Sequence, residues 1–385
     1  MDFAFNEQQE QVRELASRFV AERVAPGYAA RERAGRIEPE LLRGMGELGL
    51  IGADLPEELG GQGVDGVTNG VIVEAIAGAD HSAAYVQLLG SLNGSILVHH
   101  ASGQMAREVV PAICRGERLV AFGLTEPRGG SDAANLQLKA KRTNDGYVLS
   151  GEKTSISLIE QASDIILFAR TGEPASGARG VTAFLVPLDQ PGVSRNRFQD
   201  VGTRAVGRGS VFFDGVKVPA ERRIGEEGAG FRVVMQGFDY SRTLIGLQCL
   251  APAAASLAET WRYVTERQAF GNPLAKYQGV TEPLAEAETL LSAARLLCYR
   301  TLWLRDRGLP HTAEAAMCKW WVPKLSFETI HRCLLTHGHA GYSTDLPHQQ
   351  RLRDVMGLQI GDGTEQIQKM VIAREKVGRV AVPYA

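Results

Sequence analysis

The chain has 385 residues, of which 44% are hydrophobic, enough to bury a large core and to form two or three domains. Its 42 Lys and Arg residues balance 44 Asp and Glu residues, so there is no basic excess to follow a phosphate backbone, and we do not expect nucleic-acid binding. No uncharged apolar run is long enough to span a bilayer, so a membrane protein is not expected either.

The first part of the chain is predicted to be helical. Asn6 and Gln9 form a capping pair, and the apolar residues that follow at helical spacing predict an amphipathic helix over residues 6–24. The same pattern, broken by Gly and Pro residues, continues to about residue 118. We therefore assign residues 1–118 to an N-terminal helical domain.

Short strands replace the helical pattern in the middle of the chain. The turn Asn144-Asp145-Gly146, followed by an apolar run, is typical of a β-hairpin. Three further runs are β-branched or aromatic and are bounded by Gly, Pro or Asp; they cover residues 164–169, 181–186 and 211–218. We expect a middle β domain over residues 119–222, a size typical of single domains.

Long Ala- and Leu-rich runs with helical period return after Pro219. They lie near residues 230–266, 280–306, 312–338 and 364–379. Gly and Pro residues at 271–273 and 308–310 separate them. We expect a C-terminal helical domain over residues 223–385, and an α+β fold for the whole chain.

Two local patterns are similar to known motifs, and we interpret neither as a site. Residues 61–66 match G-x-G-x-x-G but follow Pro56-Glu57-Glu58-Leu59, which is no strand, so a surface loop is expected instead of a dinucleotide fingerprint. The second pattern consists of His331, Cys333, His337 and His339. Its spacing matches no zinc pattern, and Gly338 and Gly341 suggest the end of a helix, so we predict no metal site.

The cysteines and the N-terminus indicate a cytoplasmic protein. The five cysteines are odd in number, widely spaced and without a C-x-x-C pair, which favours reduced thiols over a disulfide framework. Asp2, Glu7 and Glu10 stand where a signal peptide would carry Lys or Arg.

Several polar segments have a chemical interpretation as well as a structural one. Residues 124–132 place hydroxyl groups and backbone N–H groups on a Gly-rich turn, which can bind a pyrophosphate or the edge of a heterocycle. Residues 238–242 place a carboxylate and a guanidinium one turn apart, and we expect them to open a helix. Asp362 lies between two glycines before the last helical run, where it could accept a proton or simply form a turn.

Together these segments closely resemble the acyl-CoA dehydrogenase family of flavoproteins. The resemblance runs from about Phe5 to Val377. It is carried by the ThrGluPro…GlySerAsp loop, the GlyGluLys segment, the ArgGlnXaaPheGly element and the GlyThrXaaGlnIle terminus. The family has an N-terminal helical domain, a middle β-barrel-like domain and a C-terminal four-helix bundle, and its members are commonly homotetramers.

The resemblance implies an FAD site between the middle domain and the C-terminal bundle, completed by a neighbouring subunit. The residues that it assigns to FAD are Phe122, Leu124, Thr125, Ser131, Ser155, Ser157, Arg267, Phe270, Gln278, Gly338, Thr364 and Gln366. The residues that it assigns to the acyl-CoA substrate are Ser131, Asp239, Arg242, Gly361 and Gly363.

Asp362 stands where the family usually has the glutamate of a Tyr-Glu-Gly-Thr run, so the resemblance implies that Asp362 is the base in α,β-dehydrogenation of a CoA thioester. Aspartate is shorter by one methylene, about 1.5 Å. Gly361 replaces the Tyr, and Ser155 replaces a Trp usual beside the flavin, which opens space near the acyl group. Some relatives place the base one residue before the arginine of the AspXaaXaaArg element, and at this alternative base position the chain has Ser241, which cannot serve as a base. A shorter base and a wider pocket fit a bulky, ring-bearing acyl group. The Phe238–Leu250 stretch and Asp362 also resemble the alicyclic branch, the cyclohexanecarboxyl-CoA and cyclohexenecarboxyl-CoA dehydrogenases.

The implied electron acceptor is an electron-transfer flavoprotein. Three alternatives stay open at this point. The acyl group could be bound to a carrier protein, the reaction could be another elimination on a CoA thioester, or the chain could be a flavin-binding member that has lost catalysis.

Overall fold

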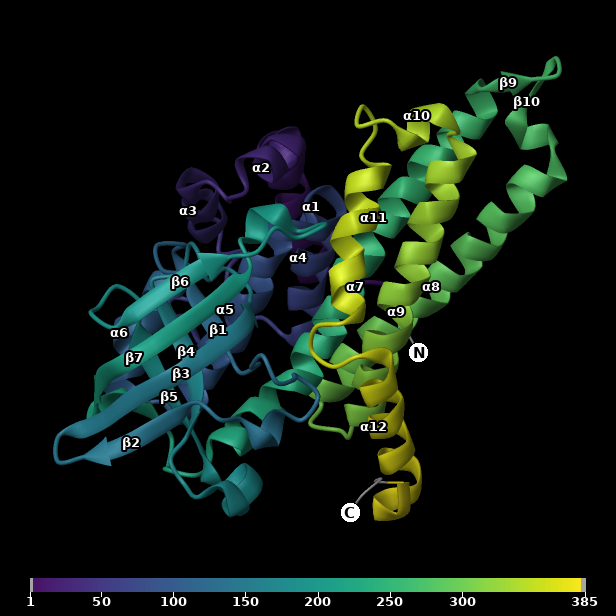
Figure 1. Cartoon of the computed structure of the whole chain (residues 1–385). Coiled ribbons are helices and arrows are strands. Elements are labelled where there is room, and N and C mark those ends of the chain that lie inside the picture. The colour runs from purple at the N-terminus through teal and green to yellow at the C-terminus, as the bar shows by residue number, and fades with distance from the viewer. Residues whose placement is uncertain (1–2, 382–385) are drawn as a thin grey trace.

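The computed structural model describes residues 3–381, in which helices form the first part of the chain, a sheet the middle and long helices the last (Figure 1). This order confirms the predicted α+β fold. The helices of the first part are α1 (Glu7–Phe19), α2 (Tyr28–Ala34), α3 (Pro39–Glu47), α4 (Gly66–Ala79), α5 (His81–His100) and α6 (Gly103–Cys114).

The start of α1 confirms the predicted capping pair. The Asn6 side chain accepts a hydrogen bond from the Gln9 N–H at 2.8 Å, and the Asn6 N–H donates to the Gln9 side chain at 3.0 Å. A π-helical turn, Val20–Val24, then continues α1. The glycine-rich segment 61–66 is a loop, as predicted, and leads into α4, which Asp65 caps.

The middle part is one twisted sheet. Its strands are β1 (Val120–Gly123), β2 (Lys139–Thr143), β3 (Gly146–Ile156), β4 (Asp164–Arg170), β5 (Val181–Pro187), β6 (Val193–Arg197), β7 (Gly209–Pro219) and β8 (Arg223–Ile224). The strand order is β6-β7-β3-β2-β4-β5-β8, and β1 pairs in parallel with β4. The predicted hairpin joins β2 to β3, with Arg142 opposite Tyr147. The sheet encloses its own hydrophobic cluster, which includes Leu149, Phe184 and Val211.

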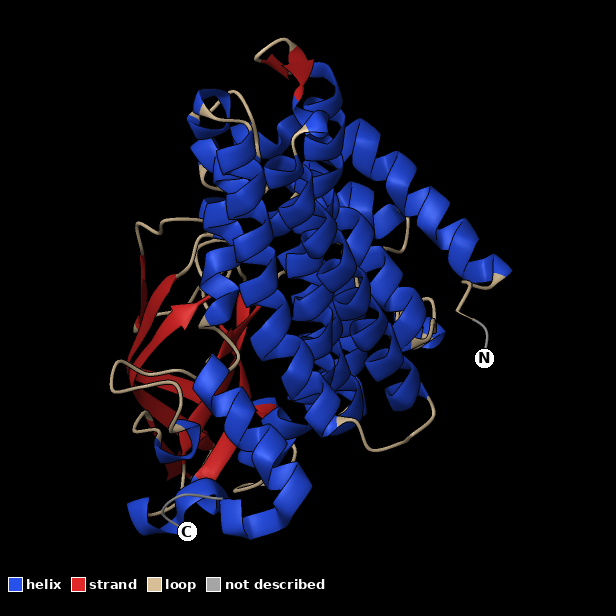
Figure 2. Ribbon diagram, turned by 90° about the vertical axis from the view of Figure 1, so that its right-hand side faces the viewer, coloured by secondary structure: helices blue, strands red, loops and turns tan. Residues whose placement is uncertain are grey.

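The last part consists mainly of long antiparallel helices that stand beside the sheet (Figures 1 and 2). They are α7 (Gly230–Glu266), α8 (Gln278–Asp306), α9 (Thr312–Thr336), α10 (His339–Tyr342), α11 (His348–Met356) and α12 (Glu365–Val377). The tip between α7 and α8 is a small hairpin of β9 (Gln268–Ala269) and β10 (Asn272–Pro273). Among the described residues, no helix combines the length and apolar character needed to cross a membrane.

One prediction about this part is wrong. Residues 238–242 do not open a helix, because α7 begins at Gly230 and they lie two turns inside it. The apolar residues before them continue the helical period, and Val233 and Val234 are buried in the core. The carboxylate of Asp239 and the guanidinium of Arg242 are therefore presented from within α7, more than two turns after its start.

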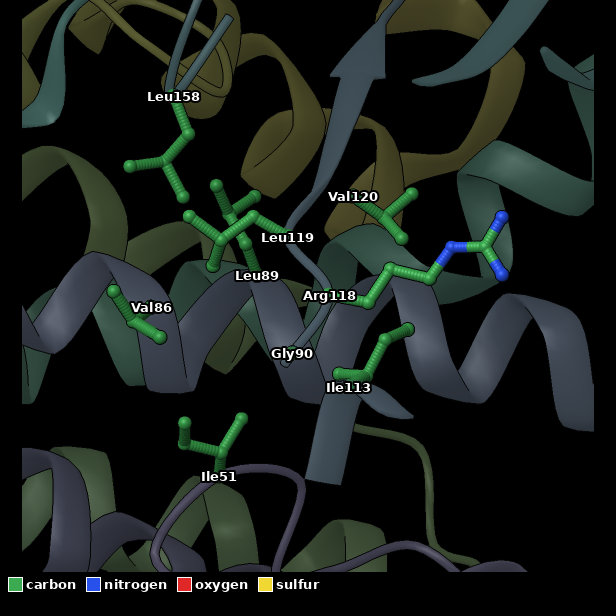
Figure 3. Close-up of a pocket in the computed structure, with 9 residues that line it drawn as sticks. All are labelled: Ile51, Val86, Leu89, Gly90, Ile113, Arg118, Leu119, Val120 and Leu158. Carbon is green, nitrogen blue, oxygen red and sulfur yellow. The ribbon is translucent and has the colours of Figure 1, made fainter. Parts of the chain in front are cut away.

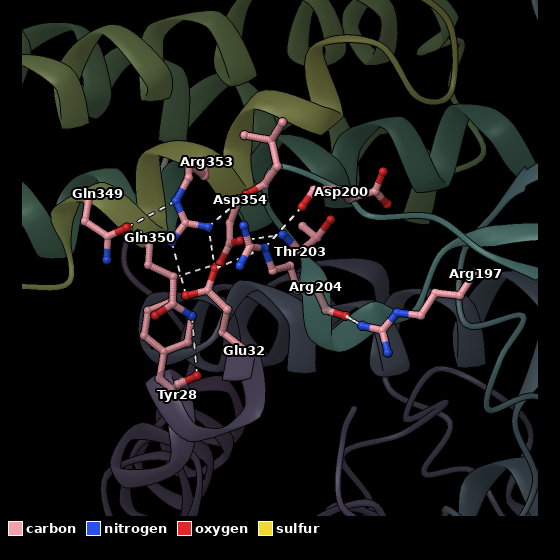
Figure 4. Close-up of polar contacts among 11 residues, drawn as sticks. Tyr28, Glu32, Arg197, Asp200, Thr203, Arg204, Gln349, Gln350, Arg353 and Asp354 are labelled. Atoms are coloured by element: carbon pink, nitrogen blue, oxygen red, sulfur yellow. Dashed lines mark hydrogen bonds and ion pairs between the residues drawn. The ribbon is translucent and has the colours of Figure 1, made fainter. Parts of the chain in front are cut away.

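A polar cluster ties the three parts together next to the sheet (Figure 4). The buried Asp354 of α11 accepts hydrogen bonds from the Tyr28 hydroxyl of α2 at 2.7 Å and from the Thr203 N–H at 2.5 Å. Arg353 pairs with Glu32 of α2 and donates to the Val201 carbonyl at 2.8 Å. Burial raises the pKa of Asp354 to about 7, against an ordinary value of 3.8. The cluster fixes the loop 200–208 against both helical parts.

Candidate active site

A cavity of about 960 Å³ lies where the middle sheet meets the first and last helical parts. Its walls come from the loop 124–134, the end of β3, the loop 200–208, α5, α7 and the turn 361–364. Eleven of the predicted site residues line it: Phe122, Leu124, Thr125, Ser131, Ser155, Ser157, Arg242, Gly361, Asp362, Gly363 and Thr364. Residues more than 200 positions apart in the sequence thus meet in one space.

A buried ion pair between Lys153 and Glu126 fixes the loop 124–134. The Lys153 ammonium of β3 donates to the Glu126 carboxylate at 2.7 Å and to the Leu124 carbonyl at 2.9 Å. The Glu126 carboxylate also accepts from the N–H groups of Gln137 and Leu138 at 2.6 and 2.9 Å. Burial lowers the pKa of Lys153 to about 8. The ThrGluPro loop, which contains Glu126, and the GlyGluLys segment, which contains Lys153, therefore support the cavity wall together.

A bulge in β3 delivers Ser155 to the cavity. Lys153 pairs with Val211 of β7 and Ile156 pairs with Gly209, so β3 has one extra residue between these pairs. Ser155 has a φ of +60° at this irregularity. Bulges of this kind redirect a side chain at the edge of a site, and both Ser155 and Ser157 line the cavity.

Asp362 lies on the turn before α12, and Thr364 caps that helix. Its side chain is half-buried and lines the cavity. The carboxylate accepts a hydrogen bond from the Ser241 hydroxyl of α7 at 3.0 Å. The residue at the alternative base position is thus in direct contact with the predicted base. Asp362 therefore borders a cavity large enough to admit a ligand.

Arg242 lines the same cavity and has unused hydrogen-bonding capacity. Its guanidinium pairs with Asp239 at 3.1 Å, while its Nε is buried and has no partner among the described residues. Asp239 itself does not line the cavity; its second oxygen accepts from the Thr312 hydroxyl at 2.5 Å. The structure therefore places Asp239 behind Arg242, where it orients the guanidinium.

Five predicted cofactor residues lie outside the cavity: Arg267, Phe270, Gln278, Gly338 and Gln366. All five are exposed. Phe270, on the tip hairpin, is 95% exposed. Except for Gln366, at the start of α12, they lie at the end of the bundle that points away from α12 (Figure 1). Within one chain these four residues, Arg267, Phe270, Gln278 and Gly338, cannot meet the residues around Asp362.

A second cavity is far smaller, about 10 Å³, and lies between α5, α6 and the start of β1 (Figure 3). That volume holds about one water molecule at most. Its lining is apolar apart from Arg118, whose guanidinium points away from it and pairs with Asp164 at 2.6 Å. It is a packing gap between domains.

The histidine and cysteine cluster at the end of α9 has a packing role, since the His337 ring stacks on the Tyr263 ring with their centroids 4.1 Å apart. The described residues contain no group of three or more side chains arranged for a metal ion.

Comparison with known proteins identifies the family. The chain matches the acyl-CoA dehydrogenase N-terminal domain over residues 6–117, the middle domain over residues 121–216 and the C-terminal domain over residues 228–377. The chain belongs to the acyl-CoA dehydrogenase family. As a member it is an FAD-dependent oxidoreductase that acts on acyl-CoA thioesters.

Individual relatives cover nearly the whole chain. The mitochondrial short-chain specific acyl-CoA dehydrogenase of Mus musculus is 33% identical over 95% of this chain and 89% of the relative. A caffeyl-CoA reductase-Etf complex subunit of Acetobacterium woodii is 31% identical over 96% of this chain and 98% of the relative. Among solved structures, butyryl-CoA dehydrogenase from Megasphaera elsdenii superposes with a TM-score of 0.94 at 31% identity, covering 98% of this chain and 100% of that chain.

The cavity suits the family's cofactor. Its volume, about 960 Å³, lies at the upper end of the range of about 300–1,000 Å³ for small-molecule sites. Gly129 in its wall has a φ of +148°, and nothing lies within 4 Å of the position that a Cβ would occupy. A bound group can therefore approach the backbone of this loop closely, as a pyrophosphate requires.

Proposed function

We propose that this chain catalyses the α,β-dehydrogenation of an acyl-CoA thioester with Asp362 as the base. The observation that carries the proposal is the position of the Asp362 carboxylate, which lines the large cavity opposite the loops of the middle sheet. A base must lie within hydrogen-bonding reach of the proton that it removes. Asp362 is the carboxylate that stands at the family's base position and is open to such a ligand.

When bound, FAD supplies the acceptor for the hydride that leaves the β-carbon. Asp362 accepts the proton from the α-carbon, and a double bond forms between the α-carbon and the β-carbon. The thioester oxygen gains negative charge in the transition state, so a donor aimed at it accelerates the reaction. We assign that role to the main-chain N–H of Asp362.

The residues of the cavity divide between the two ligands. For FAD we propose Phe122, Leu124, Thr125, Ser131, Ser155, Ser157 and Thr364, which line the cavity in one chain. Arg267, Phe270, Gln278, Gly338 and Gln366 are exposed, and in this proposal those at the hairpin end reach the FAD of a second copy. We propose a homotetramer as the assembly that supplies them.

For the CoA thioester we propose contacts to Ser131, Arg242, Gly361 and Gly363, with Asp239 acting through Arg242. The buried, unpartnered Nε of Arg242 favours a ligand with hydrogen-bond acceptors at this point. Gly361 leaves space: the nearest atom to a Cβ there would be in Leu358, 3.8 Å away.

The acyl group is proposed to be short or compact. Relatives are named for short-chain and butyryl substrates, which favours butyryl-CoA. The open space at Gly361 favours a bulkier ring, so cyclohexanecarboxyl-CoA is the second candidate. One relative is a subunit of a reductase-Etf complex, and we therefore propose an electron-transfer flavoprotein as redox partner. Because the base of one direction is the acid of the other, the same site would also serve enoyl-CoA reduction.

The test is loss of the flavin's yellow colour in an anaerobic titration with butyryl-CoA and cyclohexanecarboxyl-CoA. For Asp362→Asn we expect bleaching to slow by about 10²–10⁴-fold, the usual contribution of a general base, while FAD stays bound. Undiminished bleaching of the Asp362→Asn variant would show that another group removes the proton.

The same titration separates the alternatives. Bleaching by a butyryl group on a carrier protein, but not by butyryl-CoA, would favour a carrier-protein substrate. Bleaching by neither, and by no other thioester, would favour a flavin-binding protein without catalysis. A product other than the α,β-unsaturated thioester would indicate a different elimination.

A further inference from the structure

The turn that carries Asp362 contains two glycines and has backbone angles that are unfavourable for a residue with a side chain. Asp362 has a φ of +54° and Gly363 a φ of +96°. The left-handed region is uncommon for a residue with a side chain and persists only where the surroundings enforce it. Glycines at 361 and 363 add conformational freedom on both sides. Something else must hold the carboxylate in place.

Lys319 of α9 is one such support. Its side chain is fully buried, and its ammonium donates to the Gly363 carbonyl at 3.1 Å. Burial lowers the pKa of Lys319 to about 8, and the charge of Asp362 is the largest influence that opposes this shift. The other charged or titratable groups that act on it are Cys249 and Arg242, both on α7. The ammonium is thus buried beside the turn that carries Asp362.

Gln368 of α12 holds the same turn from the other side. Its side-chain amide is fully buried and donates to the Asp362 carbonyl at 2.8 Å and to the Gly363 carbonyl at 3.3 Å. The contact is so close that a Cβ on residue 363 would lie 2.5 Å from the Gln368 nitrogen. Together with the φ of +96°, this close approach favours glycine at position 363.

Ser241 of α7 contacts the carboxylate directly. Its hydroxyl lies 3.0 Å from Asp362 Oδ2 and 3.2 Å from the Phe238 carbonyl, and its side chain is buried. A hydroxyl has one proton, so when it donates to Asp362 it selects one orientation of the carboxylate. Three helices thus fix three atoms of one short turn.

We infer that Ser241, Lys319 and Gln368 are positioning residues that hold Asp362 for proton abstraction. The inference rests on the proposed function, in which Asp362 is the base. An aspartate reaches about 1.5 Å less far than a glutamate, and a misplacement of about 1 Å can cost about a hundredfold in rate. A short base on a strained turn therefore depends on its supports more than a long one does. Lys319 contributes by fixing the Gly363 carbonyl, one residue from Asp362.

The main experiment uses Lys319→Met, which keeps the length of the side chain and removes its charge and donor. The readout is incorporation of solvent deuterium at the α-carbon of butyryl-CoA in D₂O, followed by NMR without an electron acceptor. We expect incorporation and kcat to fall about 10–100-fold, with KM and the FAD content of the purified protein unchanged. Lys324→Met is the matched control, because Lys324 lies exposed on the same helix and forms only a 3.9 Å ion pair with Glu328.

The pH profile gives a readout that a purely structural role would not move. Activity of the wild type should decline as the pH rises through about 8, because Lys319 loses its charge there. The Lys319→Met variant should lack this decline. An unchanged profile together with wild-type incorporation in folded Lys319→Met protein would overturn the inference.

Ser241→Ala provides a second variant in case Lys319→Met fails to fold, since it removes a single hydroxyl. We expect incorporation to fall at least about threefold and Ser241→Thr to restore it, because Thr keeps the donor. Wild-type incorporation by folded Ser241→Ala protein would also overturn the inference. If Asp362→Asn abolishes bleaching while both variants behave as wild type, the proposed function stands and the positioning role fails. If Asp362→Asn bleaches normally, the proposed function itself fails.

Discussion

Two regions of this molecule carry residues of the same proposed site but differ in how those residues are held. The cavity side is the region around the large cavity, and the hairpin side is the β9–β10 hairpin between α7 and α8. On the cavity side, Glu126, Lys153 and Lys319 are buried and bonded within one chain. On the hairpin side, Phe270 is 95% exposed and Arg267 is exposed as well. The first region is complete in a single chain, whereas the second presents its groups to something outside it.

This difference predicts two kinds of mutational effect. Removing one member of a buried ion pair leaves an uncompensated charge and lowers stability. Altering an exposed group away from such contacts changes stability by less than about 0.5 kcal/mol, so any large effect there must come through binding. Loss of folding on one side and loss of association on the other would establish the distinction.

The largest effect is expected for Lys153→Met. Loss of the ammonium leaves the Glu126 carboxylate buried without its cation, and we expect the free energy of unfolding to fall by about 3–5 kcal/mol. Urea titration followed by circular dichroism measures it. Lys369→Met is the control, because Lys369 is exposed and its ion pair with Glu365 should contribute at most about 1 kcal/mol. Equal losses in both variants would contradict the assigned role of Lys153.

Asp354→Asn should change the pH dependence of stability on the cavity side. The pKa of Asp354 is raised to about 7, so between about pH 4 and pH 7 the folded state keeps a proton that the unfolded state has lost. The protonated Asp354 therefore stabilises the folded state fully below about pH 4, and this stabilisation is lost as the pH rises through about 7. The asparagine of the variant cannot ionise, so the stability difference between wild type and variant should shift by a few kcal/mol, in order of magnitude, from about pH 4 to about pH 8.

Denaturant titrations at several pH values measure this shift. Asp145→Asn, on the exposed turn between β2 and β3, is the control and should leave the pH dependence as it is in the wild type. A parallel pair of curves for wild type and Asp354→Asn would contradict the prediction.

Phe270→Asp should have a different signature on the hairpin side. We expect unchanged stability of the isolated chain, weaker self-association in analytical ultracentrifugation, and a loss of about 10–100-fold in FAD affinity. A charge in an interface between copies is unfavourable, and a tip that no longer docks cannot reach a neighbour's cofactor. Phe3→Asp is the control, because Phe3 is also exposed but precedes α1 and is not part of the hairpin between α7 and α8. Unaltered FAD affinity would mean that one chain suffices.

The smallest effect is expected for Gly361→Tyr. The added ring fills space near the acyl group, with Leu358 as the nearest side chain. Turnover of cyclohexanecarboxyl-CoA should fall at least about tenfold relative to butyryl-CoA, the discrimination typical of a change in pocket size. Steady-state kinetics with both thioesters measure the ratio, and butyryl-CoA turnover serves as the internal control. An unchanged ratio would place the acyl group elsewhere in the cavity.

Much of the fold could be predicted from local patterns. The capping pair at Asn6 and Gln9, the hairpin at 144–146 and α7 over residues 230–266 all follow from spacing and turn chemistry, and the structure confirms each. The short helix α11 and the strand β6 have no clear period, since both are polar on most positions. The prediction that residues 238–242 open a helix is wrong because polar residues there resemble a helix start.

The site was predictable in identity more than in arrangement. The motif residues around Asp362 were found through the family resemblance, and eleven of them line one cavity. The pairing of Lys153 with Glu126 was not predicted, although both residues stood in the quoted motifs and have opposite charge. Lys319 gave no signal beyond a lysine in an otherwise Ala- and Trp-rich helix. Long-range pairing of this kind depends on the tertiary fold, which local spacing does not encode.

The sheet's separate hydrophobic cluster has a consequence for how the molecule loses its structure. Strand residues such as Leu149 and Val211 pack on one another, while a different cluster runs through both helical parts and takes in the other face of β4 and β5, with Phe168 and Leu185. Segments with their own contact group tend to open cooperatively as units, and a ligand stabilises the folded form that binds it. Stripping away FAD should therefore loosen the strands first, with their amides exchanging ahead of those of the long helices.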